Sequence, residues 1–273
     1  DPDFKVTDDC GVVVKYMPEV PVHLVAGEES NMKLTYKEDT FLLDKLFQLR
    51  GSQAPEVPGK EHFGGRVAVV FGGSYGIGKD IATELRNAGA KVHSFSRSLT
   101  GTDVGNRRDV ARALKEVADK EGKIDYVINT AGVLNKEPLC SMDYSIIQAA
   151  VQTNYMGTVN VALEAYSYLK QTQGQLIFFT SSSYTRGRAF YSIYSSTKAA
   201  IVNFVQAIAQ EWESVGIRVN CINPERTKTP MRVKNFGVEP DDTLLKSEVV
   251  ADATVRCLMA DYTGQVIDVK RQG

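Results

Sequence analysis

The chain has 273 residues, of which 43% are hydrophobic and 24% charged, and its formal net charge is −1. This composition is typical of a folded protein with a sizeable core, and the balanced charge argues against a nucleic-acid partner. No run reaches the roughly 18 apolar residues that a membrane span needs, so no membrane partner is expected either.

The four cysteines are widely spaced and include no Cys-x-x-Cys pair. The sequence therefore predicts neither a disulfide framework nor a metal site, and reduced thiols in the cytoplasm are the default expectation. The chain starts at Asp1 without an initiator Met or a charged and apolar leader. We therefore expect no secretory signal and a start within a longer protein.

The first fifty residues predict a short strand at 20–25 and an amphipathic helix at 37–50. Residues 51–59 contain two prolines and two glycines without a hydrophobic period, which is typical of a linker. Fifty residues of this kind make a poor core alone. We therefore expect a separate fragment at 1–50, followed after the linker by a domain at 60–273.

Beyond the linker, strand patterns alternate with helical patterns. Strands that alternate with helices of ten or more residues predict βαβ units. The expected fold is therefore a doubly wound, Rossmann-type α/β domain with a parallel sheet covered on both faces. The predicted strands are 66–71, 91–95, 124–129, 175–180, 217–222 and 265–269, and the predicted helices are 79–88, 109–121, 144–170 and 195–215.

A glycine loop follows the first strand of this domain and opens its first helix. Gly72, Gly76 and Gly78 have the spacing Gly-x-x-x-Gly-x-Gly. In this context backbone N–H groups and a helix N-terminus can approach a pyrophosphate. A tight turn without a ligand is the alternative, since glycine also suits positive φ. The surrounding motifs favour the dinucleotide.

The second strand is followed by Ser96-Arg97-Ser98, where an NAD-selecting domain would carry an acidic residue. A guanidinium flanked by hydroxyls can bind the 2′-phosphate of NADP, which a carboxylate would repel. The sequence therefore predicts NADP(H) as cofactor. The alternative is that Arg97 is only a solvated loop residue.

Tyr194 and Lys198 are four residues apart, and Ser181 precedes Tyr194 by thirteen. Alone, the first two could simply be neighbours on a helix face. Together with the glycine loop they indicate hydride transfer, because a ketone that receives hydride needs a general acid and an oxyanion stabiliser on one side. Tyr194 is the expected acid, and the ammonium of Lys198 would lower its pKa.

From residue 59 onward, these motifs resemble the short-chain dehydrogenase/reductase family, although Phe71 stands where Thr is usual. The resemblance implies that Asn154 orders a water, that Ser181 binds the carbonyl oxygen and that Lys198 also holds the nicotinamide ribose. Ser182 and Ser183 are rivals to Ser181, which alone gives the family's interval to Tyr194. The catalytic residues so implied are Asn154, Ser181, Tyr194 and Lys198.

The cofactor site implied by the same resemblance includes the segment after the strand at 217–222. In the family this segment usually reads Asn-Pro-Gly and carries a Thr for the nicotinamide carboxamide. Here Glu225 replaces that glycine, which bears on the roles of Thr227 and Thr229. The expected cofactor-binding residues are Gly72, Ser74, Tyr75, Gly76, Ile77, Gly78, Ser96, Arg97, Ser98, Asp103, Val104, Asn129, Ala131, Gly132, Tyr194, Lys198, Thr227 and Thr229.

The two loops expected to border the substrate are rich in cations. Converging Arg and Lys side chains suit a phosphate, whereas scattered surface charge is the alternative. The six basic residues are Arg186 and Arg188 in one loop and Arg226, Lys228, Arg232 and Lys234 in the other. The candidate phosphate ligands are Arg186, Arg188, Arg226 and Lys228.

The N-terminal fragment resembles the C-terminal end of sugar-phosphate cytidylyltransferases related to methylerythritol phosphate cytidylyltransferase. The likeness rests on the segments 6–9, 22–27 and 31–39. It implies that Thr7 and Lys33 contact phosphate. The Gly-rich nucleotide loop of such a domain is missing, so the fragment cannot transfer a nucleotide by itself.

This arrangement is similar to the bifunctional enzymes that join a ribulose 5-phosphate reductase to a CDP-ribitol pyrophosphorylase. The similarity implies NADPH-dependent reduction of D-ribulose 5-phosphate to D-ribitol 5-phosphate for CDP-ribitol and capsule synthesis in the cytoplasm. The implied partners are a phosphorylated pentulose, a cytidylyltransferase domain of the same polypeptide and further copies in a dimer or tetramer. The alternatives are a reductase of an unphosphorylated carbonyl or polyol, and a catalytically silent scaffold for the transferase.

Overall fold

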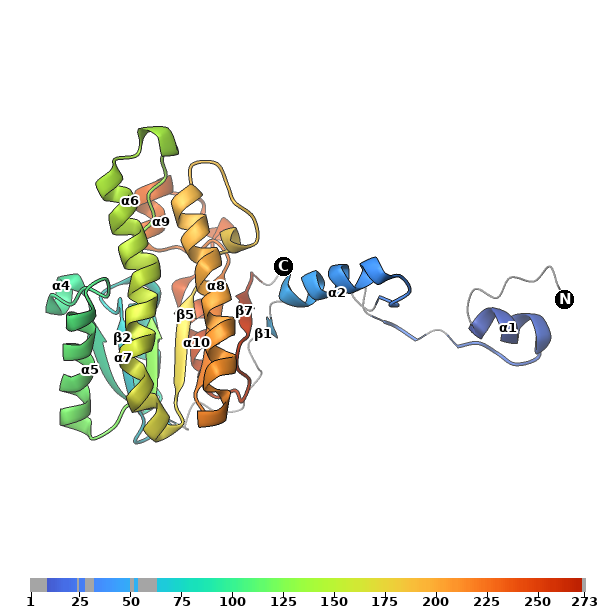
Figure 1. The fold of residues 1–273 in the computed structure, drawn as a ribbon, viewed down its shortest axis with the longest axis horizontal. Coiled ribbons are helices and arrows are strands. Elements are labelled where there is room, and N and C mark those ends of the chain that lie inside the picture. The colour runs from blue at the N-terminus through green and yellow to red at the C-terminus, as the bar shows by residue number, and fades with distance from the viewer. Residues whose placement is uncertain (1–8, 24, 28–31, 50–51, 54–62, 272–273) are drawn as a thin grey trace. The chain divides into compact units, whose positions relative to one another are not determined.

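The computed structural model describes residues 9–23, 25–27, 32–49, 52–53 and 63–271 and divides the chain into two compact units, Asp1–Leu49 and Arg50–Gly273. The first unit contains the helices α1 (Asp9–Tyr16) and α2 (Lys37–Leu49) (Figure 1). Helix α2 confirms the predicted helix, and α1 was not predicted. The predicted strand at 20–25 was wrong, because the described residues of this unit offer no neighbouring strand to complete its hydrogen bonds.

Local capping, rather than a core, accounts for the order of α2. The carboxylate of Asp39 accepts hydrogen bonds from the backbone N–H groups of Thr35 and Tyr36, at 2.8 and 2.7 Å. No side chain whose burial is described in this unit is buried. Val25 is 88% exposed and Phe41 is 74% exposed. The unit therefore has no hydrophobic core among its described residues.

The second unit is built on a seven-stranded parallel sheet in the order β1-β7-β6-β5-β4-β2-β3. This confirms the predicted doubly wound α/β fold. The strands are β1 (Ser52–Gln53), β2 (Val67–Phe71), β3 (Lys91–Phe95), β4 (Tyr126–Asn129), β5 (Gln175–Phe179), β6 (Arg218–Pro224) and β7 (Val266–Val269).

Strand β1 falls inside the segment 51–59 that was predicted to be a linker. Ser52 and Gln53 pair with Ile267 and Asp268 of β7, so two linker residues extend the sheet. Composition could not predict this, because edge pairing uses only backbone groups. The remaining linker residues lie outside the described part of the chain.

Helices follow the strands as predicted, with one interruption. A π-helical turn (Gln152–Met156) breaks the helix expected at 144–170, and α4, α9 and α10 were not predicted. The helices are α3 (Gly76–Asn87), α4 (Arg97–Thr100), α5 (Arg107–Glu121), α6 (Tyr144–Val151), α7 (Gly157–Thr172), α8 (Ser192–Trp212), α9 (Pro230–Phe236) and α10 (Ser247–Leu258).

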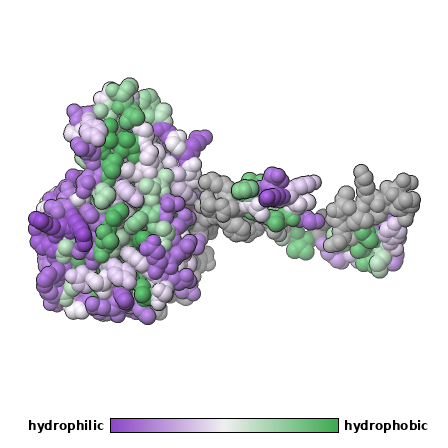
Figure 2. Space-filling model, in the orientation of Figure 1, coloured by the Kyte–Doolittle hydropathy of each residue, from purple (hydrophilic) through white to green (hydrophobic). Residues whose placement is uncertain are grey.

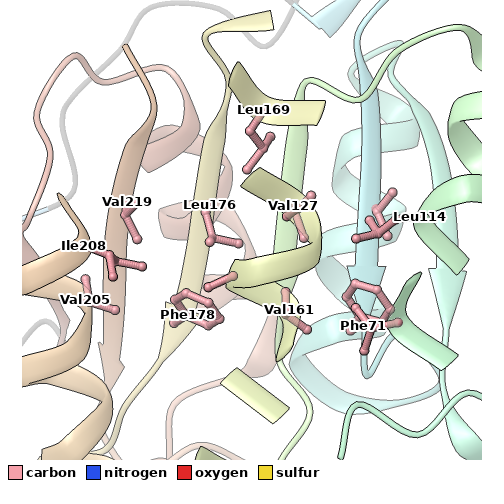
Figure 3. Close-up of a cluster of buried hydrophobic side chains, with 14 of the residues drawn as sticks. Phe71, Leu114, Val127, Val161, Leu169, Leu176, Phe178, Val205, Ile208 and Val219 are labelled. Atoms are coloured by element: carbon pink, nitrogen blue, oxygen red, sulfur yellow. The ribbon is translucent and has the colours of Figure 1, made fainter. Parts of the chain in front are cut away.

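The sheet is buried on both faces. Helices α5, α7 and α8 cover one face, where Leu176 and Phe178 of β5 pack in a cluster with Val161 of α7 and Val205 of α8 (Figure 3). Helices α3 and α10 cover the other face with the alternate residues of the same strands. Such two-sided burial explains why the strands read as continuous apolar runs.

One apolar surface patch and the order of the strands bear on function. Val151, Met156 and Leu163 are exposed along α6 and α7, where Figure 2 shows apolar atoms gathered. Among the described residues, no helix has both the length and the apolar character needed to cross a bilayer. The sheet order reverses between β2 and β4, and this is the position at which open α/β sheets bind ligands.

Candidate active site

A cavity of about 330 Å³ lies at the carboxyl ends of the central strands. It gathers residues that follow β2, β4, β5 and β6, although these are far apart in the sequence. Of the predicted site residues, those lining it are Gly72, Ser74, Tyr75, Gly76, Ile77, Gly78, Ser96, Arg97, Ser98, Asp103, Val104, Ala131, Gly132, Ser181, Arg188, Tyr194, Lys198, Arg226, Thr227 and Thr229.

Two glycines of the loop, Gly72 and Gly78, have no room for a side chain. Gly72 has φ +80°, and a Cβ there would lie 2.7 Å from the backbone nitrogen of Ala131. A Cβ on Gly78 would collide with the Gly72 carbonyl oxygen and the Thr130 hydroxyl. Backbone can thus approach a pyrophosphate at the start of α3, as a Rossmann-type site requires.

Ser96 and Arg97 have different environments. The hydroxyl of Ser96 accepts a hydrogen bond from Leu99 N at 3.1 Å, so it caps α4. Arg97 is exposed at the cavity and forms no ion pair with the described residues. Its guanidinium can therefore reach a ligand, while the Ser96 hydroxyl is already engaged.

Asn129 and Asn154 do not line the cavity but fix the backbone beside it. Asn129 Oδ1 accepts from Ala131 N at 3.1 Å. Asn154, in the π-helical turn, accepts from Val133 N at 2.8 Å and donates to Val133 O at 3.0 Å. Both asparagines therefore hold the segment after β4, which contributes Ala131 and Gly132 to the cavity.

The serine, tyrosine and lysine meet where β5 ends and α8 begins. Lys198 Nζ lies 5.6 Å from the ring centroid of Tyr194 and donates to Phe179 O at 2.9 Å. Ser181 begins the turn after β5, and Ser183 donates to its hydroxyl at 3.3 Å. Ser183 thus orients Ser181, the residue that the sequence favoured among the three serines.

Burial governs the ionisation of this group. It raises the pKa of Tyr194, while the hydrogen bond with Ser181 and the charge of Arg232 act in the opposite direction. Burial also lowers the pKa of Lys198 to about 8. At neutral pH the Tyr194 hydroxyl is therefore protonated and can donate its proton. The Lys198 ammonium beside it loses its proton at a lower pH than an ordinary lysine does.

The segment that carries Glu225 in place of glycine is held on two sides. Glu225 Oε2 accepts from Arg271 N at 3.0 Å, and Arg271 Nη1 donates to Asp242 O at 2.8 Å. Thr227 donates to Glu225 O at 2.8 Å, and Thr229 accepts from Arg232 N at 3.2 Å. The glutamate therefore anchors the segment, and both threonines still line the cavity.

The basic loops divide into two groups. Arg188 and Arg226 line the cavity, and neither forms an ion pair with a carboxylate among the described residues. Arg186 is outside the cavity lining, as is Lys228, whose Nζ lies 2.6 Å from the Asp241 carboxylate. Spacing alone could not separate these residues, because tertiary contacts decide which way each side chain points.

Sequence reasoning missed several residues of the cavity. Arg232 lines it but is not among the four candidate phosphate ligands, and Tyr191 and Phe236 stack with their ring centroids 6.0 Å apart. Thr130 lies between Asn129 and Ala131, which were both predicted, so its position in the sequence was a usable signal. No motif marks Tyr191 and Phe236. The other missed lining residues include Thr102, Leu134, Thr153, Thr180 and Met231.

A family model described as short chain dehydrogenase matches residues 98–237, about half of the chain. The chain belongs to the short chain dehydrogenase family. This short chain dehydrogenase is therefore an oxidoreductase that uses a nicotinamide cofactor.

Among its relatives is the bifunctional ribulose 5-phosphate reductase/CDP-ribitol pyrophosphorylase Bcs1 of Haemophilus influenzae, 49% identical over 96% of this chain and 56% of that protein. This dehydrogenase thus spans little more than half the length of that relative. Ipsdienol dehydrogenase of Ips pini is 35% identical over 64% of this chain and 79% of its own. The 3-ketoacyl-(acyl-carrier-protein) reductase of Brucella melitensis, solved with NADH, has a TM-score of 0.70 at 22% identity, covering 76% of this chain and 97% of its own, and shows the shared fold.

Proposed function

We propose that the chain reduces D-ribulose 5-phosphate to D-ribitol 5-phosphate with NADPH. The observation that carries the proposal is the 49% identity to the bifunctional relative over 96% of this chain, which must include most of the N-terminal unit. The matched structure from Brucella melitensis covers only 76% of the chain. The likeness to the bifunctional relative therefore extends beyond the reductase fold.

The chemistry follows from the groups at the end of β5. A bound nicotinamide supplies hydride to the carbonyl carbon. The Tyr194 hydroxyl donates its proton to the carbonyl oxygen, and the Ser181 hydroxyl stabilises that oxygen as it gains charge. Lys198 favours the resulting tyrosinate by its positive charge. By the family resemblance, it also holds the nicotinamide ribose, and a water ordered by Asn154 would restore the proton.

Cofactor choice is assigned to Arg97. Its exposed guanidinium at the cavity suits the 2′-phosphate of NADP, and no acidic residue occupies positions 96–98. Asp103 and Val104 would meet the adenine, and Thr227 and Thr229 the nicotinamide carboxamide. The cofactor would then extend along one cavity lining, from Arg97 to Thr227 and Thr229.

The substrate phosphate is assigned to Arg188 and Arg226. Both line the cavity and neither forms an ion pair with a described carboxylate, so each can donate to a dianion, although Glu225 and Glu239 partly offset the charge of Arg226. Arg186 and Lys228 lie outside the lining and become matched controls. Alanine at 188 or 226 should raise KM for ribulose 5-phosphate about ten- to a hundred-fold, the worth of a charged hydrogen bond, whereas alanine at 186 or 228 should change it little.

The N-terminal unit is proposed to be the end of a cytidylyltransferase domain, at residues 1–50, joined at 51–59 to the reductase at 60–273. Its exposed apolar side chains, Val25 and Phe41 among them, suit a segment completed by the rest of such a domain. The transferase would convert ribitol 5-phosphate to CDP-ribitol in the cytoplasm, for capsule synthesis. Association of copies through the apolar face of α6 and α7 is part of this proposal.

One substrate panel tests the function. The chain is incubated with NADPH and either ribulose 5-phosphate, ribulose or an unrelated ketone, cofactor oxidation is followed, and the product is identified by NMR. We expect kcat/KM to be highest for the phosphorylated ketose. Equal values for ribulose and ribulose 5-phosphate would instead favour a reductase of neutral carbonyls, and no turnover of any carbonyl would favour a silent scaffold.

A further inference from the structure

Arg232 differs from the other cations that border the substrate side of the cavity. Its Nε donates to Glu239 Oε2 at 2.6 Å and its Nη2 donates to Oε1 at 2.8 Å, a bidentate ion pair with both side chains only about 20% exposed (19% and 21%). Arg188 and Arg226 form no such pair in the described chain. The cavity therefore presents one guanidinium held in a bidentate ion pair and two that are not, although the charge of Arg226 also acts on Glu225 and Glu239.

Arg232 is also fixed in orientation. Its guanidinium carbon lies 3.8 Å from the ring centroid of Phe236, and that ring stacks on Tyr191 with an interplanar angle of 16°. The backbone N–H of Arg232 donates to Thr229 Oγ1, which caps α9. One edge and one face of the guanidinium are thus occupied. The remaining N–H groups of its five have no partner among the described residues.

The guanidinium and the proposed proton donor share one cavity. Arg232 lines the same cavity as Tyr194, and its positive charge acts on the Tyr194 hydroxyl and on that of Tyr191, where it lowers both pKa values against the larger effect of burial. A substrate carbonyl that accepts a proton from Tyr194 would therefore occupy the same cavity as the Arg232 guanidinium.

The ion pair with Glu239 determines which kind of substrate group Arg232 can bind. A dianion gains little from a guanidinium whose charge is already balanced, and it would meet the carboxylate as well. A hydroxyl oxygen accepts a fixed N–H without that penalty. Buried donors also discriminate strongly against analogues that leave them unpaired.

We propose that Arg232, positioned by Glu239 and Phe236, binds a hydroxyl of the substrate beside the carbonyl carbon, while Arg188 and Arg226 take the phosphate. Arg232 is then a specificity residue that selects hydroxyketones over plain ketones. The assignment to a pentulose phosphate rests on the proposed function, but the recognition of an adjacent hydroxyl does not.

The test compares Arg232→Ala with Lys234→Ala, an exposed basic residue of the same helix that lies outside the cavity lining. The substrates are ribulose 5-phosphate and its 1-deoxy and 3-deoxy analogues. We expect Arg232→Ala to lower kcat/KM for ribulose 5-phosphate about ten- to a hundred-fold, and to lower it much less for the analogue that lacks the bound hydroxyl. Lys234→Ala should match the unmutated chain.

Glu239→Gln tests the positioning role separately. Removing the carboxylate charge leaves Arg232 uncompensated, so inorganic phosphate should become a better competitive inhibitor, by about tenfold or more. Unchanged phosphate inhibition in this variant would overturn the neutralising role of Glu239. Thermal unfolding and NADPH binding of each variant would establish that it is folded.

Two further outcomes would overturn the assignment of Arg232. One is an equal loss in Arg232→Ala for hydroxylated and deoxy substrates. The other is a collapse of the preference for ribulose 5-phosphate over ribulose, which would make Arg232 a phosphate ligand. If the unmutated chain does not reduce pentulose phosphates, the proposed function fails but the assignment of Arg232 can still be tested. The comparison is then between a hydroxyketone and the matching plain ketone, such as hydroxyacetone and acetone.

Discussion

The ammonium nitrogen of Lys198 donates a 2.9 Å hydrogen bond to the carbonyl oxygen of Phe179, the last residue of β5. In the reverse direction, the hydroxyl of Thr180 donates to the carbonyl oxygen of Lys198 at 2.8 Å. These two bonds join α8 to the end of β5. Tyr194 on the helix and Ser181 after the strand, the proposed general acid and oxyanion-binding residue, are therefore held in register.

The buried Lys198 should make stability depend on pH. Its pKa is lowered by burial from 10.5 to about 8, so the unfolded chain binds more protons between these values and stability rises with pH across that window. Relative to Lys198→Met, the unmutated chain should gain on the order of 3 kcal/mol in free energy of unfolding from below pH 8 to above 10.5. Urea unfolding of both chains measures this, and a constant difference between them would refute it.

Tyr194→Phe should remove the proton donor and keep the ring. We expect kcat to fall by roughly 10²–10⁴, the contribution usual for general acid catalysis, while NADPH affinity changes little. Steady-state kinetics and cofactor titration provide the two measurements. Near-normal turnover in the variant would mean that another group supplies the proton.

Arg97→Ala should erase most of a preference for NADPH over NADH. The charged hydrogen bonds to the 2′-phosphate are worth about 1.5–3 kcal/mol, so the ratio of kcat/KM for the two cofactors should fall about ten- to a hundred-fold. Arg86→Ala, on the neighbouring helix α3 and outside the cavity lining, is a suitable control. Equal use of both cofactors by the unmutated chain would contradict the assignment.

Glu225→Gly would install the residue that the family usually carries at this position. It removes the hydrogen bonds that Arg271 donates to the carboxylate, so the free energy of unfolding should fall by about 1 kcal/mol and KM for NADPH should rise. Arg271→Ala keeps the backbone N–H that donates to Glu225 and loses only the side-chain bonds to Glu225 and to Asp242 O, so the double variant should lose less than the sum of the two single losses. Fully additive losses would show that the two residues act independently.

The sequence predicted the layers of the reductase unit well because the central strands are buried on both faces and each long helix has one apolar side. It failed where the outcome depends on partners. Within the described part of the N-terminal unit, the segment predicted as a strand at 20–25 has no neighbouring strand, and the π-helical turn at Asn154 leaves the hydropathy pattern of 144–170 unbroken. The helix at 230–236 begins at Pro230 in a loop-like stretch and is too short to show a hydrophobic period.

The site was predictable where chemistry fixes the spacing, and unpredictable where side-chain direction matters. Tyr194 and Lys198 are four residues apart on one helix, so their interval in the sequence already predicts that they lie one turn apart on the same side. Lys228 and Arg232 are also four residues apart, yet ion pairs with Asp241 and Glu239 send one outside the cavity lining and the other into it. No local pattern encodes that choice, since Coulombic partners come from a later segment.

The proposed catalytic residues and the substrate-side arginines belong to different elements, so the two groups can be altered separately. Ser181, Tyr194 and Lys198 sit on a strand end and a helix that buried hydrogen bonds lock together, whereas Arg188, Arg226 and Arg232 belong to outer loops and a short helix. Retargeting the enzyme to a new ketone would therefore require exchanging Arg226, residues 230–239 and the loop around 188 together, while Thr227 and Thr229 are kept for the cofactor. The reacting groups would keep their alignment, and a single scaffold could serve many carbonyl compounds.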